Sequence, residues 1–377
     1  MTRRALLGFS LVIALGCRVA QASDLAGDVW EMIEAQDRAV DGGEIQHKKI
    51  AARVEETISS LSAEDWKQPR NYRAAVIYVL AGGSPTRLRR LLRDHVIEEA
   101  TPPLLTASLA FADGDREAAT KLFSPIDVRA FPPILAGHLA LIRGSLLIGV
   151  DNTEADKSLS FARLIMPGSQ VEEAALRREL AIVDPKTEFD RYILLARRYQ
   201  FRYPSSPFAE KYWQSLTITA SKVGLAFGPD ALASTEELFK AAPAKFGFEF
   251  HAALARASIL LSRADVLRSQ TQAAAAFAEK AQATERLELY QAAADAMNGD
   301  LAASDSSIKN INASKLNREE VKILNAIRGV GVRLGDAGEQ QQTLPAADGP
   351  SAETPLVQRL QQTLEDSRKL LHRAGGQ

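Results

Sequence analysis

The amino-acid sequence predicts an all-α fold, arranged as an array of antiparallel helix pairs. Alanine and leucine are abundant, and only 6% of the 377 residues are aromatic. This composition favours helices, because alanine and leucine have high helix propensity. Runs of alternating β-branched residues, which are typical of strands, are missing. Apolar residues instead recur at helical spacing in segments that are separated by Gly, Pro, Asp and Ser.

The predicted helices are bounded by residues that start or stop helices. Gly82 and Gly83 end one segment, and Ser84 is the expected N-cap of the next. Pro85 fits the first helical position, because a missing N–H costs nothing there. In chain order, the predicted helices are Asp24–Val40, Glu44–Leu61, Asn71–Leu80, Pro85–His95, Thr101–Ala112, Arg116–Leu122, Pro132–Ile148, Lys157–Leu164, Val171–Val183, Glu188–Phe201, Pro207–Val223, Thr235–Ala241, Phe248–Leu261, Ala264–Ala283, Glu285–Met297 and Arg318–Leu334.

The pairing of these helices resembles that of tetratricopeptide repeats. Short helices joined by short turns make antiparallel pairs, and many pairs in succession make an α-solenoid. The stretch Leu105 to Asp127 has small residues where paired helices would touch, a Gly-Asp turn and a proline near its end. No strict repeat period is present, so we predict a degenerate tetratricopeptide-like helical-repeat array.

Residues 1–22 have the pattern of a cleavable signal peptide. The positively charged "MTRR" precedes an apolar run from Ala5 to Cys17, and the small-x-small triplet Ala20 to Ala22 suits signal peptidase. We expect cleavage near Ala22 and export to the periplasm. The alternative is a lipoprotein anchored through Cys17, because "ALGC" is an imperfect lipobox.

The composition excludes several classes of function. Cys17 is the only cysteine, so the mature chain would hold no disulfide, catalytic thiol or thiolate metal site. The 46 basic and 47 acidic residues nearly balance, so no general attraction to nucleic acid or anionic lipid is expected. After the signal segment, no apolar run reaches the length that spans a membrane.

The helical body is expected over residues 23–334, followed by a flexible linker at 335–354 and an amphipathic helix at 355–377. The linker is rich in Gly, Pro, Gln and small residues, and it lacks the large apolar groups that offset chain entropy. In the last segment, four leucines recur near helical spacing: Leu356, Leu360, Leu364 and Leu371. This helix either packs on the body, is tethered for a partner, or is only partly formed.

The sequence contains no recognised motif for catalysis or cofactor binding. The five histidines are neither paired at i, i+4 nor set in a zinc-protease pattern. Nucleophile elbows and phosphate-binding loops are absent as well. His138 lies on an apolar helix and is interpreted as a core residue with a hydrogen-bonded ring. We therefore expect a non-enzymatic protein without a cofactor or metal ion.

The predicted helix Pro85–His95 carries a row of arginines. One interpretation is a solvated face whose long side chains cover apolar surface. The other is a docking patch for an acidic partner or envelope polymer. Four residues are retained as candidate partner-binding residues: Arg87, Arg89, Arg90 and Arg93.

The stretch "SQVEEAALRR", residues 169–178, has the densest local pattern of charge. Ser169 and Glu172 fit a capping box, and Glu172 and Glu173 complement the helix dipole. Arg177 follows Glu173 at i+4, the favourable order for an ion pair. Arg178 falls on an apolar side, so it should be partly buried and need a carboxylate or carbonyl partner. All five residues are predicted to be structural.

The segment "RRYQFRY" mixes bases and rings, as some nucleic-acid surfaces do. Because the chain is expected to be exported, we interpret the rings as inter-helix packing and the arginines as its polar edge. The residues concerned are Arg197, Arg198, Tyr199, Phe201, Arg202 and Tyr203.

Four segments in order carry a family resemblance: "NYRAAVIYVLAGGSP", "AGHLALIRGSLL", "ARLIMPGSQVEEAALRREL" and "ARRYQFRYPSSPFAEKYW". Together they resemble MotC, a family of periplasmic chemotaxis proteins found with flagellar motor genes of rhizobia and related alphaproteobacteria. The likeness runs over residues 29–216 and is weaker over the divergent part, 217–334.

The resemblance implies a non-enzymatic protein that is required for flagellar rotation and that associates with the periplasmic domain of the stator protein MotB. It implies no catalytic or contact residues. A general periplasmic scaffold for cell-envelope or secretion assembly is the first alternative. A peptidoglycan-cleaving enzyme is the second, although the sequence shows no compact catalytic domain. The oligomeric state stays open.

Overall fold

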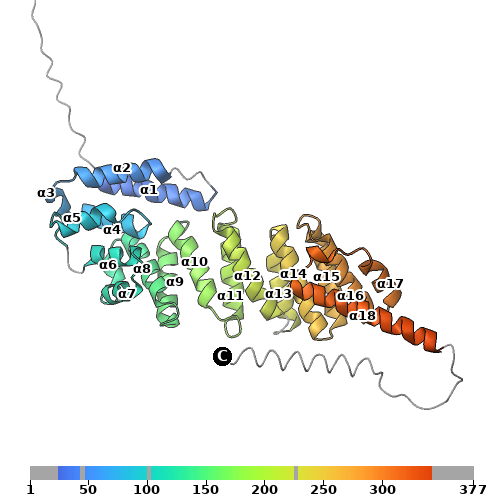
Figure 1. The fold of residues 1–377 in the computed structure, drawn as a ribbon. Coiled ribbons are helices and arrows are strands. Elements are labelled where there is room, and N and C mark those ends of the chain that lie inside the picture. The colour runs from blue at the N-terminus through green and yellow to red at the C-terminus, as the bar shows by residue number, and fades with distance from the viewer. Residues whose placement is uncertain (1–23, 43–46, 100–102, 225–227, 342–377) are drawn as a thin grey trace, which may run out of the picture. The chain divides into compact units, whose positions relative to one another are not determined.

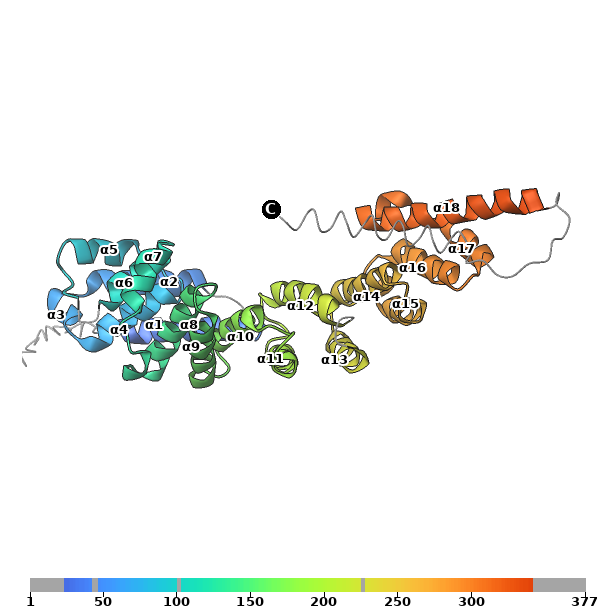
Figure 2. The ribbon, with the colours of Figure 1, turned by 90° about the horizontal axis from the view of Figure 1, so that it is seen from below.

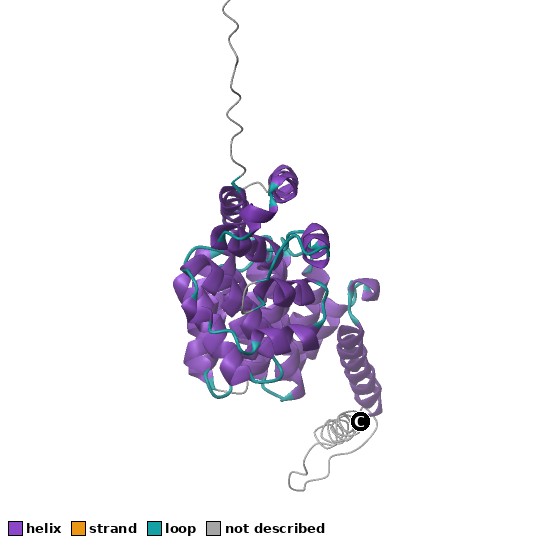
Figure 3. Ribbon diagram, turned by 90° about the vertical axis from the view of Figure 1, so that its left-hand side faces the viewer, coloured by secondary structure: helices purple, strands orange, loops and turns teal. Residues whose placement is uncertain are grey.

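Every regular element of the described chain is a helix. The computed structural model describes residues 24–42, 47–99, 103–224 and 228–341, and no strand occurs in these ranges (Figure 3). The all-α prediction is therefore confirmed. The expected signal peptide at 1–22, linker residues 342–354 and the expected tail helix at 355–377 lie outside the described residues.

The chain divides into two compact units, and the division falls inside the body that we predicted at 23–334. Unit 1 is built from the described residues up to Ile182, together with Ser205–Pro207. Its helices (Figure 1) are α1 (Leu25–Val40), α2 (His47–Ser60), α3 (Ala63–Trp66), α4 (Pro69–Leu80), α5 (Thr86–Arg93), α6 (Leu104–Ala112), α7 (Arg116–Phe123), α8 (Pro133–Leu147), α9 (Asn152–Ile165) and α10 (Gln170–Ile182), with one 3₁₀ turn, η1 (Val128–Ala130).

Unit 2 contains the other described residues from Val183 onward. Its helices are α11 (Phe189–Arg202), α12 (Ala209–Gly224), α13 (Pro229–Phe239), α14 (Ala244–Leu260), α15 (Ala264–Ala278), α16 (Thr284–Met297), α17 (Leu301–Ile308) and α18 (Arg318–Gln341), with one 3₁₀ turn, η2 (Ala313–Lys315). Within this unit, α18 lies alongside α16 and α17 (Figure 2).

Helices that follow one another in the sequence pack together as antiparallel pairs. The pairs include α6 with α7, α8 with α9, α14 with α15, and α16 with α17. Between α6 and α7 the chain turns through Gly114, whose φ of 77° suits a residue without a Cβ. Asp115 then caps α7, because its carboxylate accepts the N–H of Ala118 at 3.0 Å. The predicted array of antiparallel helix pairs is confirmed.

Small residues set the close approach of α8 and α9 in unit 1. Ala155, Leu159 and Ala162 form one face of α9, and all three are fully buried. They face α8 at Gly144, where a Cβ would lie 2.7 Å from Leu159 Cγ and 3.0 Å from the carbonyl oxygen of Ala155. Only glycine fits this position without a shift of the neighbouring helix.

Aromatic rings connect the helices in the first half of unit 2. The rings of Tyr199 and Tyr212 stack with centroids 4.1 Å apart, which joins α11 to α12. Phe239 of α13 and Phe250 of α14 stack at 3.9 Å. Trp213 of α12 contacts Phe239 at 5.8 Å between centroids. These ring contacts join four consecutive helices of the unit, α11 to α14.

Several helix bounds differ from the sequence prediction. Helix α5 begins at Thr86, so Pro85 is its N-cap, and the hydroxyl of Ser84 accepts the N–H of Thr86 at 3.4 Å. The predicted helix 264–283 ends at Ala278, because the chain reverses at Gln282, whose φ is 55°. Gln282 was misjudged because a non-glycine residue rarely adopts this conformation.

Two differences concern the C-terminal part of unit 2. Helix α17 was not predicted, because its serines and aspartate have low helix propensity. Tertiary contact compensates: Ser304 is buried, and its hydroxyl donates to the carbonyl oxygen of Ala292 in α16 at 2.8 Å. Helix α18 continues past the predicted end at Leu334 to Gln341. Residues 335–341 of the predicted linker are therefore helical.

Substituting Gly144 tests the close contact between α8 and α9. We expect Gly144→Ala to lower the free energy of unfolding by about 1–2 kcal/mol, because the new methyl group forces the two helices apart. Gly329→Ala in α18 is the matched control, since no atom lies within 4 Å of its added Cβ. Urea unfolding followed by circular dichroism measures both, and equal stability of the two variants would contradict the packing account.

Candidate functional site

Helix α5 presents its arginines on the surface of unit 1. Leu88 is fully buried and anchors the helix, while the side chains of Arg87, Arg89, Arg90 and Arg93 are exposed. Arg89 pairs with Asp113, and Arg93 Nε lies 3.5 Å from Asp94 Oδ1. Within the described part of the chain, Arg87 and Arg90 form no ion pair. The helix therefore displays two uncompensated cations to solvent.

The N-terminus of α10 is satisfied by side chains from both near and distant residues. Ser169 Oγ accepts the N–H of Glu172 at 3.2 Å, as predicted. The carboxylate of Glu172 accepts the N–H of Gly168 at 2.6 Å. From α1, Asp37 accepts the N–H of Gln170 at 2.7 Å. Burial raises the pKa of Asp37 above its usual value, although this hydrogen bond lowers it.

The predicted pair of Glu173 and Arg177 forms within α10. Arg177 donates from Nε to Oε1 of Glu173 at 2.7 Å and from Nη2 to Oε2 at 3.0 Å. The hydroxyl of Ser206 donates to the same carboxylate at 3.3 Å. Because Glu173 is fully buried, this bidentate contact compensates a charge that is removed from water.

The expectation for Arg178 is confirmed. Its guanidinium is partly buried, and Nη1 donates to the carbonyl oxygen of Ala174 at 3.0 Å. Burial lowers the pKa of Arg178, and the neighbouring charge of Arg177 lowers it further. The guanidinium of Arg178 thus hydrogen-bonds to the backbone of its own helix, which suits a structural role.

Glu179 is a buried carboxylate that the sequence pattern did not reveal. It is fully buried, and it accepts from the hydroxyl of Ser160 and from Nε of Arg163, which lies 2.7 Å away. Both donors come from α9, so these hydrogen bonds join α10 to α9.

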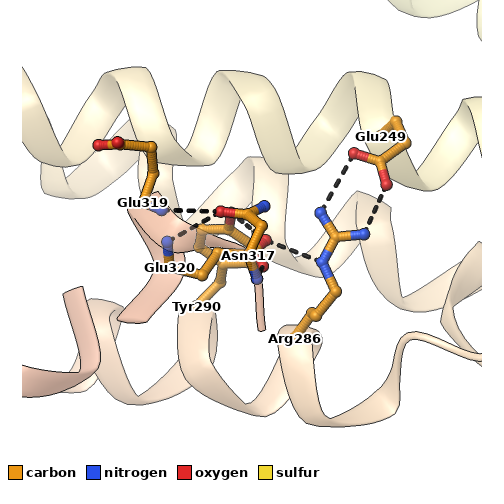
Figure 4. Close-up of polar contacts among 6 residues, drawn as sticks. All are labelled: Glu249, Arg286, Tyr290, Asn317, Glu319 and Glu320. Carbon is orange, nitrogen blue, oxygen red and sulfur yellow. Dashed lines mark hydrogen bonds and ion pairs between the residues drawn. The ribbon is translucent and has the colours of Figure 1, made fainter. Parts of the chain in front are cut away.

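A second network, buried at Glu320 and partly exposed at Glu249, joins three helices of unit 2 (Figure 4). Arg286 of α16 donates to Glu249 of α14 at 2.5 and 3.1 Å, and from Nε to Glu320 of α18 at 2.8 Å. The hydroxyl of Tyr290 donates to Glu320 at 2.9 Å. Burial by itself lowers the pKa of Arg286, but the hydrogen bonds and charges of Glu249 and Glu320 raise it overall.

Glu320 also belongs to the cap of α18. Asn317 Oδ1 accepts the N–H groups of Glu319 and Glu320, each at 3.0 Å, and Glu320 Oε2 accepts the N–H of Asn317 at 3.0 Å (Figure 4). This is a reciprocal capping box. The segment "NREE" has the spacing of a capping box, so this cap could be recognised from the sequence. The contact of Glu320 with Arg286 could not, because the two residues are 34 positions apart.

His138 is buried in α8, and its Nδ1–H donates to the carbonyl oxygen of Ile134 at 2.8 Å, which confirms the core interpretation. Burial lowers the pKa of its ring. In the described ranges, no three His, Cys, Asp or Glu side chains group as metal ligands. No helix there combines the length and apolar character needed to cross a bilayer.

Removing Arg286 tests the network around Glu320. We expect Arg286→Ala to cost about 3–5 kcal/mol of unfolding free energy, because it leaves the fully buried Glu320 carboxylate without its cation. Glu320→Gln in the same chain should recover part of the loss. Arg263→Ala removes a solvent-exposed pair with Asp265 and should change the stability by about 0.5 kcal/mol or less. Similar losses in Arg286→Ala and Arg263→Ala would refute a buried network.

Comparison with known proteins identifies relatives of the chain. The family model described as chemotaxis protein MotC matches residues 30–375. Chemotaxis protein MotC of Rhizobium meliloti (strain 1021) is 30% identical over 170 residues, which cover 45% of this chain and 39% of that relative. The aligned region thus spans well under half of the curated relative. No solved structure matches the chain.

The family match extends the resemblance noted over residues 29–216 into the divergent part and beyond it. Because the family model covers most of the 377 residues, the resemblance to the MotC family is confirmed. The chain belongs to the family of the chemotaxis protein MotC.

Proposed function

We propose that this chain is a non-enzymatic periplasmic protein that supports flagellar rotation by binding the periplasmic domain of a MotB-like stator subunit. Membership of the MotC family supports a role in motility. An array of helix pairs offers a large rigid surface, which is the common property of helical-repeat binding proteins. In this role the chain stabilises or positions the stator domain, and no cofactor takes part.

The observation that carries the assignment of a binding surface is the exposed arginine face of α5. Leu88 anchors the helix in the core, so the backbone that carries Arg87 and Arg90 is held in place before binding. Positive charges gathered on one helix favour rapid and selective association with an acidic surface. Arg89 is held by Asp113, and we assign it the role of orienting the face.

Export is part of the proposal, and residues 1–22 support it through their charged start, apolar run and Ala20 to Ala22 triplet. We expect mass spectrometry of the mature protein to find Ser23 at its N-terminus. A lipid mass on Cys17 would show the lipoprotein alternative instead. Recovery of the intact N-terminus from the cytoplasm would contradict export.

Charge reversal on α5 tests the binding surface. We expect Arg87→Glu with Arg90→Glu to weaken binding of the purified periplasmic MotB domain by about tenfold or more, because two attractive charges become repulsive. Calorimetry at low and moderate salt measures the affinity, which should fall with salt for the unaltered chain.

The control carries the same change of charge on another surface. Arg263 and Arg268 are exposed in unit 2, and reversing both should leave the affinity unchanged. Equal weakening by both double variants would reject α5 as the contact surface. A deletion strain that still swims fully would reject the motor role, and partners drawn only from cell-wall assembly would favour the scaffold alternative.

A further inference from the structure

Helix α11 packs on unit 2 through one side only. Tyr192, Ala196 and Tyr199 are buried on that side. The hydroxyl of Tyr212 in α12 donates to the carbonyl oxygen of Ala196 at 3.1 Å. Gln200 Nε2 donates to the carbonyl oxygen of Leu238 in α13 at 3.1 Å. These contacts fix which side of α11 faces its own unit.

The opposite side of α11 carries a row of four residues, Asp190, Leu194, Arg197 and Phe201, which we call the α11 row. Their spacings of four, three and four place them along one line of the helix. Leu194 is 67% exposed and Phe201 is 87% exposed. Leu194 and Phe201 thus form an apolar strip at the surface, and exposed apolar patches can mark interaction sites.

Phe201 corrects the interpretation from the sequence. Inter-helix packing was expected for all three rings of its segment, and Tyr199 and Tyr203 are indeed buried. Phe201 was assigned wrongly, because it stands on the line of Leu194 and not on the line of the tyrosines. Among the described residues, none buries the Phe201 ring, which is 87% exposed.

We propose that the α11 row is a docking surface for an amphipathic helix of another protein, one with two apolar residues two turns apart and an acidic residue between them. Leu194 and Phe201 are separated by two helical turns, about 10 Å along the axis. Arg197 stands between them and is exposed, and within the described residues it forms no ion pair. An acidic group placed opposite Arg197 is held between two apolar contacts, which exclude water from the pair.

Charge argues against a second copy of this chain as the occupant. A symmetric antiparallel contact that places Leu194 on Phe201 of the second copy puts the symmetry axis beside position 197, so Arg197 meets Arg197 of that copy. Two like charges then lie next to one another and repel. A partner with an acidic residue meets no such repulsion.

The width of the row argues against a lipid surface. An interfacial helix buries a broad apolar face, whereas Ile193 and Leu195 beside the row are already buried. Asp190 lies in the same row, and an acidic group there opposes contact with anionic lipid. A single helix lying along α11 fits a row that is one residue wide.

This surface is independent of the proposed function, because it lies in unit 2 and involves none of the α5 arginines. Its test uses the full chain and two synthetic helical peptides as probes. Both peptides carry leucines two turns apart, with glutamate between them in one peptide and lysine in the other. We expect the glutamate peptide to bind about tenfold tighter than the lysine peptide, because only its charge opposes that of Arg197.

Three variants test whether the peptides bind to the α11 row. Leu194→Ala with Phe201→Ala should weaken the glutamate peptide about tenfold or more, since both apolar contacts are lost. Arg197→Glu should reverse the preference between the two peptides. Ile218→Ala with Leu260→Ala removes exposed apolar side chains elsewhere in unit 2 and should change neither affinity. Circular dichroism shows that each variant is folded, which is expected because every altered side chain is exposed.

Four outcomes overturn the proposal. The first is equal affinity for the two peptides, and the second is equal weakening by the Ile218/Leu260 control. The third is a dimer in sedimentation velocity that Leu194→Ala with Phe201→Ala dissolves, which would make a second copy the occupant. The fourth is binding to phosphatidylglycerol vesicles that the same double variant abolishes, which would make the occupant a membrane.

Discussion

An all-helical chain must satisfy the polar groups at every helix end, because each α-helix leaves four N–H and four C=O groups without intrahelical partners. Eighteen α-helices occur in the described residues, so this constraint recurs throughout both units. Carboxylates and an amide at the N-caps meet it repeatedly. The local examples are Asp24 on Gly27, Asp115 on Ala118, Asp151 on Glu154, Asp300 on Ala303 and Asn317 on Glu320.

In two places the same chemistry also builds tertiary structure. Asp37 belongs to α1 but accepts an N–H at the start of α10, so one carboxylate satisfies a helix end and joins two helices. Glu320 accepts the N–H of Asn317 and also receives Arg286 and Tyr290 from α16. Removing such a carboxylate would disturb a helix end and an inter-helix contact together. Asp37 and Glu320 therefore contribute to the packing of their own units.

The sequence predicted those features that depend on residues three or four positions apart. The helical class, the turn at Gly114, the Ser169 cap and the pair of Glu173 with Arg177 are all of this kind. The full burial of Glu173 and Glu179 was not predictable, because it depends on α9 and on residues near Ser206. The partners of Arg286 lie more than thirty residues away in either direction, at separations of 37 and 34. Phe201 was misread because sequence alone does not reveal which side of α11 meets its neighbours.

The contact between Asp37 and Gln170 has a consequence for the order of folding. It joins residues that are 133 positions apart, whereas most helix pairs here are formed by neighbours in the sequence. Contacts of long sequence separation form late, because the intervening chain must first lose its freedom. During synthesis α1 leaves the ribosome well before α10, so Asp37 can accept the N–H of Gln170 only after α10 has been made. Although α1 is the first helix of the described residues, it is thus among the last to reach all of its native contacts.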